Sequence, residues 1–363
     1  MRGSLAAARD DLSLVAYSPA VTIVGNGQMS VIESTIDQPK EAGAASAPSP
    51  VLTVDDRLQG RHVRSDLDLN RADAELLLET AAWLKRLRQA DEPHPYLAGK
   101  TLGLIFQHPS TRTRNAFQAG MEQLGGHATF LGTHDLQLSR GETLADTAAI
   151  MSRYVDAIAA RFSRQDDLET FAAGSTVPVF NALTERYHPL EAMSDLLTLR
   201  ERFGRLDRLK LTYIGDGNNV CHSLLLGAAL VGVSVTVASP PGYQPDPAIV
   251  AIARDRANQA GGTITLTDDP IAAAIGADAV YTDVHESMGQ PNEPGKGAAL
   301  APFKVTAAVM ATARSTAVFM HCLPMHRGQE VDAEVADGPQ SIVFEQAEHR
   351  LHLHKALLLL ALA

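Results

Sequence analysis

Residues 101 to 126 constrain the fold of this chain more than any other stretch. The apolar run Thr-Leu-Gly-Leu-Ile-Phe is followed by Gln-His-Pro, by Ser-Thr-Arg-Thr-Arg, and by a periodic segment that stops at Gly125 and Gly126. This order predicts a buried strand, a turn and a helix. The turn places hydroxyls and a guanidinium at the helix N-terminus, where N–H groups and the helix dipole favour an anion. We therefore predict an anion site here; the alternative is a well-capped helix with surface arginines.

Composition sets the scale of the fold and excludes two kinds of partner. With 363 residues, 45% of them hydrophobic, the chain can bury a large core and is expected to form two domains. No apolar run approaches the ~20 residues of a membrane span. The net charge of −11 argues against nucleic-acid binding, so an anionic substrate must be held by local positive charge.

Cysteine usage and the start of the chain indicate a cytoplasmic protein. Cys221 and Cys322 are its two cysteines, which are too few for a disulfide framework and suit a reducing compartment. The first residues lack the apolar core of roughly 7–15 residues that a signal peptide requires, so we expect no export.

Alternating strand and helix patterns predict an α/β protein. Residues 1–60 lack periodicity and are rich in Ala, Ser, Pro and Gly, so we expect a disordered extension. The rest predicts two open parallel-sheet α/β domains, 61–190 and 191–343. An apolar helix within 344–363 is expected to pack back on the first domain. The predicted strands are 101–106, 127–132, 157–162, 177–183, 210–214, 233–238, 263–267, 279–283 and 318–322.

Charged residues stand at strand ends, where parallel sheets bind ligands. Arg161 closes an apolar strand, either as a substrate ligand or as a salt-bridge anchor. His188 precedes a proline and opens a helix, where a neutral imidazole can hydrogen-bond a carbonyl oxygen; a buried capping histidine is the commoner case. Arg350 lies on the last helix, among histidines that have no acid or thiol at metal-ligand spacing, so we expect no metal there.

The second half carries three more polar motifs. Gly-Asp-Gly-Asn-Asn at 215–219 opens a helix but lacks the third glycine of a dinucleotide fingerprint, and its amides suit a carboxylate or an amine. Asp283 offers a carboxylate to an ammonium group and is followed by Ser287, Met288 and a glycine. His-Cys-Leu-Pro at 321–324 places a thiol at the end of the last strand, with a buried structural cysteine as the alternative.

Together and in this order, over about residues 62 to 361, these motifs resemble those of the ornithine carbamoyltransferases within the aspartate/ornithine transcarbamylase family. The Ser-Met-Gly segment separates the ornithine enzymes from their relatives. The resemblance implies a carbamoyl-phosphate domain and a Rossmann-like ornithine domain. It also implies transfer of a carbamoyl group from carbamoyl phosphate to L-ornithine, giving L-citrulline and phosphate in arginine metabolism. No cofactor would take part, and the chain would assemble as a homotrimer or a multiple of trimers.

The family's functional residues carry over by position. Catalysis would rest on Arg112, Arg161, His188 and Cys322. If the chain is a trimer, the loop 137–142, Gln-Leu-Ser-Arg-Gly-Glu, is our candidate for reaching into the neighbouring subunit's site, because it is polar, contains a glycine and lies between a strand and a helix. Carbamoyl phosphate would be bound by Ser110, Thr111, Arg112, Thr113, Arg161, His188, Glu191, Cys322, Leu323 and Arg350, and ornithine by Asn219, Asp283, Ser287 and Met288.

Two positions depart from the family pattern and keep other functions open. Glu191 stands where the family has glutamine, and His285 stands where it usually has tryptophan. The first position belongs to the carbamoyl site and the second to the ornithine loop. The alternatives are a paralogous transcarbamylase acting on another amino-acid amine, and a non-catalytic binding subunit.

Overall fold

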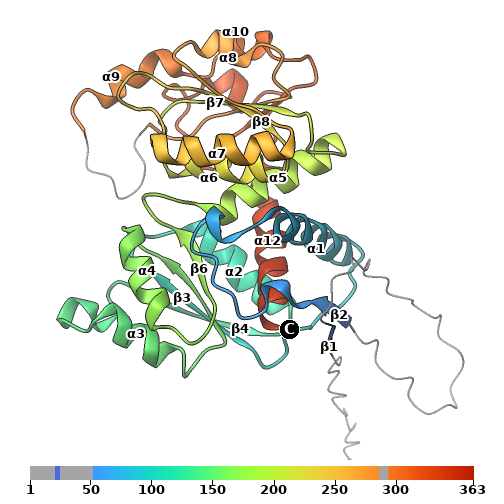
Figure 1. The fold of residues 1–363 in the computed structure, drawn as a ribbon, viewed down its shortest axis with the longest axis vertical. Coiled ribbons are helices and arrows are strands. Elements are labelled where there is room, and N and C mark those ends of the chain that lie inside the picture. Colours follow the sequence, from blue (N-terminus) through green and yellow to red (C-terminus); the bar gives the residue numbers. More distant parts are fainter. Residues whose placement is uncertain (1–20, 25–51, 286–292) are drawn as a thin grey trace, which may run out of the picture.

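The computed structural model describes residues 21–24, 52–285 and 293–363, which form two α/β lobes joined by long helices (Figure 1). The first lobe contains a four-stranded parallel sheet in the order β4-β3-β5-β6. Its strands are β3 (Thr101–Phe106), β4 (His127–Gly132), β5 (Ala157–Arg161) and β6 (Val179–Leu183). Its helices are α1 (Arg71–Gln89), α2 (Thr111–Gln123), α3 (Leu144–Met151) and α4 (Gln165–Gly174).

The second lobe contains a five-stranded parallel sheet in the order β11-β10-β7-β8-β9. Its strands are β7 (Lys210–Ile214), β8 (Ser234–Ala238), β9 (Ile264–Thr267), β10 (Ala279–Tyr281) and β11 (Val318–Met320). Its helices are α6 (Asn219–Leu230), α7 (Pro247–Ala260), α8 (Pro270–Ala274), α9 (Lys296–Leu300), α10 (Ala307–Thr312) and α11 (Ala333–Ala336). Counted along the chain, this is the 3-2-1-4-5 order of a Rossmann fold, so the Rossmann-like expectation is confirmed.

Each sheet has a point where the strand order reverses, and ligands of such folds bind there. In the first lobe the reversal lies between β3 and β5, directly before Ser110 and at Arg161. In the second it lies between β7 and β10, directly before the 215–219 motif and Asp283. The Ser-Thr-Arg-Thr-Arg turn, Arg161, the 215–219 motif and Asp283 therefore stand where the topology opens the sheets.

Two helices bind the lobes together. Helix α5 (Pro189–Phe203) follows the first sheet and leads to the second, so the boundary expected after residue 190 falls within it. Helix α12 (Val343–Leu362) packs on α1, α2 and α5, which confirms that the C-terminal helix returns to the first lobe (Figure 1). Gly120 of α2 allows this contact, because a Cβ there would come within 3.1 Å of the Lys355 side chain on α12.

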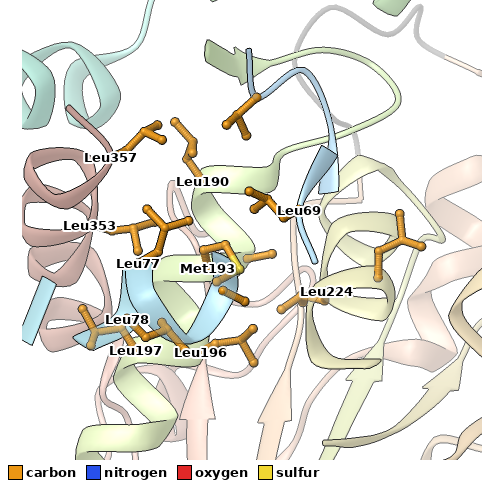
Figure 2. Close-up of a cluster of buried hydrophobic side chains, with 14 of the residues drawn as sticks. Leu69, Leu77, Leu78, Leu190, Met193, Leu196, Leu197, Leu224, Leu353 and Leu357 are labelled. Atoms are coloured by element: carbon orange, nitrogen blue, oxygen red, sulfur yellow. The ribbon is translucent and has the colours of Figure 1, made fainter. Parts of the chain in front are cut away.

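The core at this junction is built chiefly from leucines of α1, α5, α6 and α12, with Met193 of α5 and Leu69 from the segment before α1 (Figure 2). Each fully buried leucine side chain contributes about 1.5–3 kcal/mol. The cluster fixes how α5 and α12 are oriented, and those two helices carry His188, Glu191 and Arg350. Its labelled members are Leu69, Leu77, Leu78, Leu190, Met193, Leu196, Leu197, Leu224, Leu353 and Leu357.

We expected disorder in residues 1–60, and the structure describes residues 21–24 and 52–60 of that segment. Strand β2 (Leu52–Asp55) pairs in parallel with β1 (Val21–Val24). A 3-10 helix, η1 (Asp56–Leu58), then places Leu58 in the core with 1% of its surface exposed. The backbone N–H of Gly60 donates to the Ala361 carbonyl at 3.1 Å. Leu58 is a single apolar residue that packs near the end of α12, and a single residue leaves no periodic signal. The sequence pattern therefore did not predict this contact.

None of the described helices combines the length and the apolar character that crossing a bilayer would require.

Candidate active site

The N-terminus of α2 carries the Ser-Thr-Arg-Thr-Arg turn. The Ser110 hydroxyl caps the helix by accepting from the Thr113 backbone N–H at 3.3 Å. Arg112, in the first turn, reaches across to the second lobe and donates from Nη2 to the Leu323 carbonyl at 2.7 Å. The turn is therefore a helix N-terminus with a guanidinium over it, placed between the lobes.

Three guanidiniums gather around this turn. Arg161 at the end of β5 is 4% exposed, and burial together with nearby Arg350 lowers its pKa to about 10. Burial and the same neighbour also lower the pKa of Arg112. An anion would relieve the repulsion that lowers the pKa values of Arg161 and Arg112, so the cluster supplies the local positive charge that a chain of net charge −11 needs in order to bind an anion.

The carboxylate of Glu191 lies within this cluster. Its Oε2 is 3.0 Å from Nη1 of Arg350 and 3.2 Å from Nε2 of His188. Arg350 also donates through Nη2 to the Thr113 hydroxyl. Burial alone would raise the pKa of Glu191, but Arg350 and His188 outweigh it and lower the pKa, so the carboxylate is ionised. Glu191, which stands where the family has glutamine, therefore points into the site, and its negative charge is neutralised chiefly by Arg350.

The second lobe contributes a carboxylate–thiol pair. Cys322 donates from Sγ to Oδ1 of Asp283 at 3.1 Å, and Asn218 donates from Nδ2 to Oδ2 at 2.8 Å. Burial, and then the Asp283 charge, raise the pKa of Cys322 well above its ordinary value. The thiol is therefore protonated near neutral pH and acts as a donor to Asp283.

Two of the residues expected to bind ornithine are placed by the structure, and two are not. Asp283 lies in the site. Asn219 is buried nearby, but its amide donates to the Thr184 carbonyl at 2.6 Å and its Oδ1 accepts from Val220 N–H. Its neighbour Asn218 is the amide that contacts Asp283. Ser287 and Met288 lie outside the described residues.

Sequence reasoning missed the residues that hold the Cys322–Leu323 turn. Nδ1 of His321 accepts from the Leu323 backbone N–H at 2.9 Å, and its Nε2 faces Oε1 of Glu330 at 3.2 Å. Gln346 of α12 accepts from the His321 N–H at 2.9 Å. His321 and Glu330 are fully buried, and the sequence offered only the position of His321 next to Cys322 as a signal.

One trio among the described residues has the donor set of a metal site: Asp283, His321 and Cys322, whose ligand atoms lie within 4.8 Å of one another. Both His321 ring nitrogens already have polar partners, and the Cys322 thiol already donates to Asp283. A metal ion here would have to displace these interactions, and none of the three side chains has a buried nitrogen or oxygen atom without a hydrogen-bond partner among the described residues.

The sequence matches family models over nearly the whole described chain. The model for the aspartate/ornithine carbamoyltransferase carbamoyl-P binding domain matches residues 61–201, and the model for the Asp/Orn binding domain matches residues 207–361. Both domains of a carbamoyltransferase are thus present, in the family's order. The chain belongs to the aspartate/ornithine carbamoyltransferase family.

Three similar proteins are named ornithine carbamoyltransferase. The chain is 52% identical over 310 residues to the ornithine carbamoyltransferase of Symbiobacterium thermophilum, covering 84% of this chain and 99% of that protein. It is 48% identical over 302 residues to the enzyme of Bacillus subtilis, covering 83% and 93%. The solved structure of ornithine carbamoyltransferase from Pyrococcus furiosus superposes with a TM-score of 0.82 at 45% identity, covering 84% and 98%.

Proposed function

We propose that this chain transfers the carbamoyl group of carbamoyl phosphate to the δ-amine of L-ornithine, releasing L-citrulline and phosphate. The observation that carries the proposal is the pairing of two half-sites at the two sheet reversals. One is the guanidinium cluster at the α2 N-terminus, and the other is the Asp283–Cys322 pair, with Arg112 donating to Leu323 between them.

Carbamoyl phosphate is assigned to the first half-site. Its phosphate suits the α2 N-terminus, with Ser110, Thr111, Arg112 and Thr113, because backbone N–H groups and a forked cation match phosphate oxygens. As the amine attacks, charge grows on the carbamoyl oxygen and then on the departing phosphate. Fixed guanidiniums and a fixed imidazole stabilise that charge with little reorganisation, and these are the roles assigned to Arg161, His188 and Arg350.

Ornithine is assigned to the second half-site. The δ-ammonium must lose a proton before its nitrogen attacks the carbamoyl carbon, and the Asp283 carboxylate is the acceptor placed for it. The C–N bond then forms, the bond from carbon to the phosphate oxygen breaks, and the second proton of the nitrogen leaves with the phosphate, while Cys322 and the Leu323 carbonyl position the amine. Because the Cys322 thiol stays protonated, it orients Asp283 rather than attacking substrate. Much of the rate comes from aligning the two bound substrates.

The acceptor is tested by measuring citrulline-type product from carbamoyl phosphate with ornithine, lysine, putrescine and N-acylated ornithine. We expect ornithine to have the highest kcat/KM and lysine, one methylene longer, to fall about 10- to 200-fold below it. Faster turnover of another amine would favour a paralogous specificity set by His285. Binding of carbamoyl phosphate without turnover of any amine would favour the binding-subunit alternative.

We further propose a cytoplasmic homotrimer, or a multiple of trimers, that serves arginine biosynthesis. Support comes from the family and from the two cysteines, neither of which forms a disulfide. The loop that begins with η3 (Gln137–Arg140) is the segment assigned to the neighbouring site, and Ile150 and Tyr154 nearby are 40% and 69% exposed. Light scattering of the active enzyme should give three chains or a multiple of three. An active monomer would exclude the arrangement.

A further inference from the structure

In the contact between His188 and Glu191, each side chain has one engaged polar atom and one buried polar atom for which the described residues offer no hydrogen-bond partner. Oε2 of Glu191 is engaged by His188 and Arg350, whereas Oε1 is buried and has no hydrogen-bond partner among the described residues. His188 is likewise engaged through one atom only. Its Nε2 faces Glu191, while its buried Nδ1 has no hydrogen-bond partner among the residues that the structure describes. His188 is 5% exposed and Glu191 1%, so water does not compensate either atom freely.

The chemistry of a carboxylate fixes where the imidazole carries its proton. An ionised carboxylate only accepts hydrogen bonds. Because Glu191 is held ionised by Arg350, Nε2 of His188 must carry the proton that faces it at 3.2 Å. A neutral imidazole has one N–H, so Nδ1 is then a bare lone pair. In that state His188 cannot donate from Nδ1 to anything.

A glutamine at this position would permit the opposite arrangement. Its amide can donate an N–H to Nε2 of the imidazole, which leaves the imidazole proton on Nδ1. A neutral His188 could then donate from Nδ1 to a carbamoyl oxygen at any pH above its pKa. With Glu191, donation from Nδ1 requires both ring nitrogens to be protonated.

We propose that His188 donates to the carbamoyl oxygen as an imidazolium, and that Glu191 is the positioning residue that imposes this state. The inference rests on the proposed function, since it takes carbamoyl phosphate as the ligand. Binding would then take up one proton from solvent at Nδ1, with no bond to the substrate broken. The proton would return to solvent when the products leave.

Charged and titratable groups surround the His188–Glu191 pair on four elements, and the arginines among them oppose an imidazolium in the ligand-free protein. Asp195 lies one turn beyond Glu191 on α5, Arg350 and His354 face from α12, Arg161 from β5 and Arg112 from α2. Burial, opposed by Glu191 and reinforced by Arg350 and Arg161, keeps the pKa of His188 below its ordinary value in the ligand-free protein. A phosphate dianion beside these arginines offsets their repulsion of an imidazolium, so its arrival favours protonation.

The test measures the proton uptake that accompanies carbamoyl phosphate binding and does not require turnover. Calorimetric titration of the full chain with carbamoyl phosphate at pH 8, in buffers of different ionisation enthalpy, should show an uptake close to one proton per site. Phosphate esters have a second pKa of about 6, so the ligand itself is already a dianion at that pH. Glu191→Gln and His188→Asn should each bind carbamoyl phosphate with essentially no uptake.

A matched control is available on α12. Glu348 faces Nε2 of His352 at 3.3 Å, so Glu348→Gln makes the same chemical change in another His–Glu pair and should leave the uptake unchanged. No uptake in the parent protein, or equal uptake in His188→Asn, would overturn the inference even if Glu191→Gln failed to fold. Absence of carbamoyl phosphate binding would overturn the proposed function as well. Proton uptake on carbamoyl phosphate binding without citrulline formation would support the inference and exclude only ornithine as the acceptor.

Discussion

Replacing Arg112 with alanine should lower kcat/KM for carbamoyl phosphate by about 30- to 1,000-fold, which corresponds to ~2–4 kcal/mol of transition-state stabilisation. Two roles are lost together. The guanidinium is the cation fixed over the α2 N-terminus, and its Nη2 holds the Leu323 carbonyl of the opposite lobe at 2.7 Å. Initial rates at varied carbamoyl phosphate and saturating ornithine measure the effect.

The same motif supplies the control. Arg114 lies two residues later, but its guanidinium stacks 3.6 Å over the Phe130 ring and its Nε donates to Gln118. Arg114→Ala should therefore lower the thermal midpoint while leaving kcat/KM within a few-fold of the parent. Arg112→Lys should fall between the two, since it keeps the charge but loses the fork that matches phosphate. If Arg112→Ala retained turnover within a few-fold of the parent, the phosphate assignment would be wrong.

Strong periodicity made most of the framework predictable. Strands 101–106, 127–132 and 210–214 are confirmed at their predicted ends, because each is a short run of aliphatic, aromatic and β-branched residues that starts or ends at a polar residue or a glycine. Short elements were missed for the opposite reason. Helix α8 has five residues, too few to show a 3.6-residue period, and its start is marked only by Asp269 and Pro270.

The candidate site was predictable in its residues but not in their pairings. Motif order marked Arg112, Arg161, His188, Asp283 and Cys322. Arg112, Arg161 and Asp283 lie at the sheet reversals, whereas His188 and Cys322 follow the edge strands β6 and β11. Partners far apart in sequence leave no local pattern. Gln346 donates to the buried Asp195 at 2.6 Å across 151 residues, and that contact depends on how α12 returns to α5.

The orientation of the Glu191 carboxylate and its charge partner could not be predicted from the sequence, and the structure decides both. A glutamate in place of glutamine could turn outward to a surface arginine, be neutralised by Arg112 and Arg161, or take up a proton. The structure turns it inward and gives it Arg350 as its nearest cation, at 3.0 Å. Since its pKa is lowered, the carboxylate is charged in the native protein above the unfolded value of about 4.3. Its ion pair therefore stabilises the fold near neutral pH and is lost only as acid protonates it.

Glu191→Gln should consequently tighten carbamoyl phosphate binding at pH 8 and flatten its pH dependence. Two unit charges about 6 Å apart, at an effective dielectric near 20, repel by roughly 2–3 kcal/mol, or about 30- to 150-fold in affinity. The same change releases Arg350 from its ion pair, so that the guanidinium can turn to the phosphate. Calorimetric affinities at pH 6.5 and pH 8 measure both effects.

In Glu191→Gln, the gain in affinity for carbamoyl phosphate should come with a loss of thermal stability. The two effects together would identify release of Arg350 from its ion pair as their cause. Arg350 is 3% exposed, and leaving one partner of a buried ion pair uncompensated typically costs about 3–5 kcal/mol. The ligand-free thermal midpoint of Glu191→Gln should fall, and carbamoyl phosphate should raise it by more than it raises the parent's. Adding Arg350→Met should restore part of the midpoint, because neither charge is then unpaired, while abolishing the tighter binding. Unchanged or weaker binding in the single variant would mean that Glu191 is adapted to a different site geometry, and the assignment of ornithine would lose ground with it.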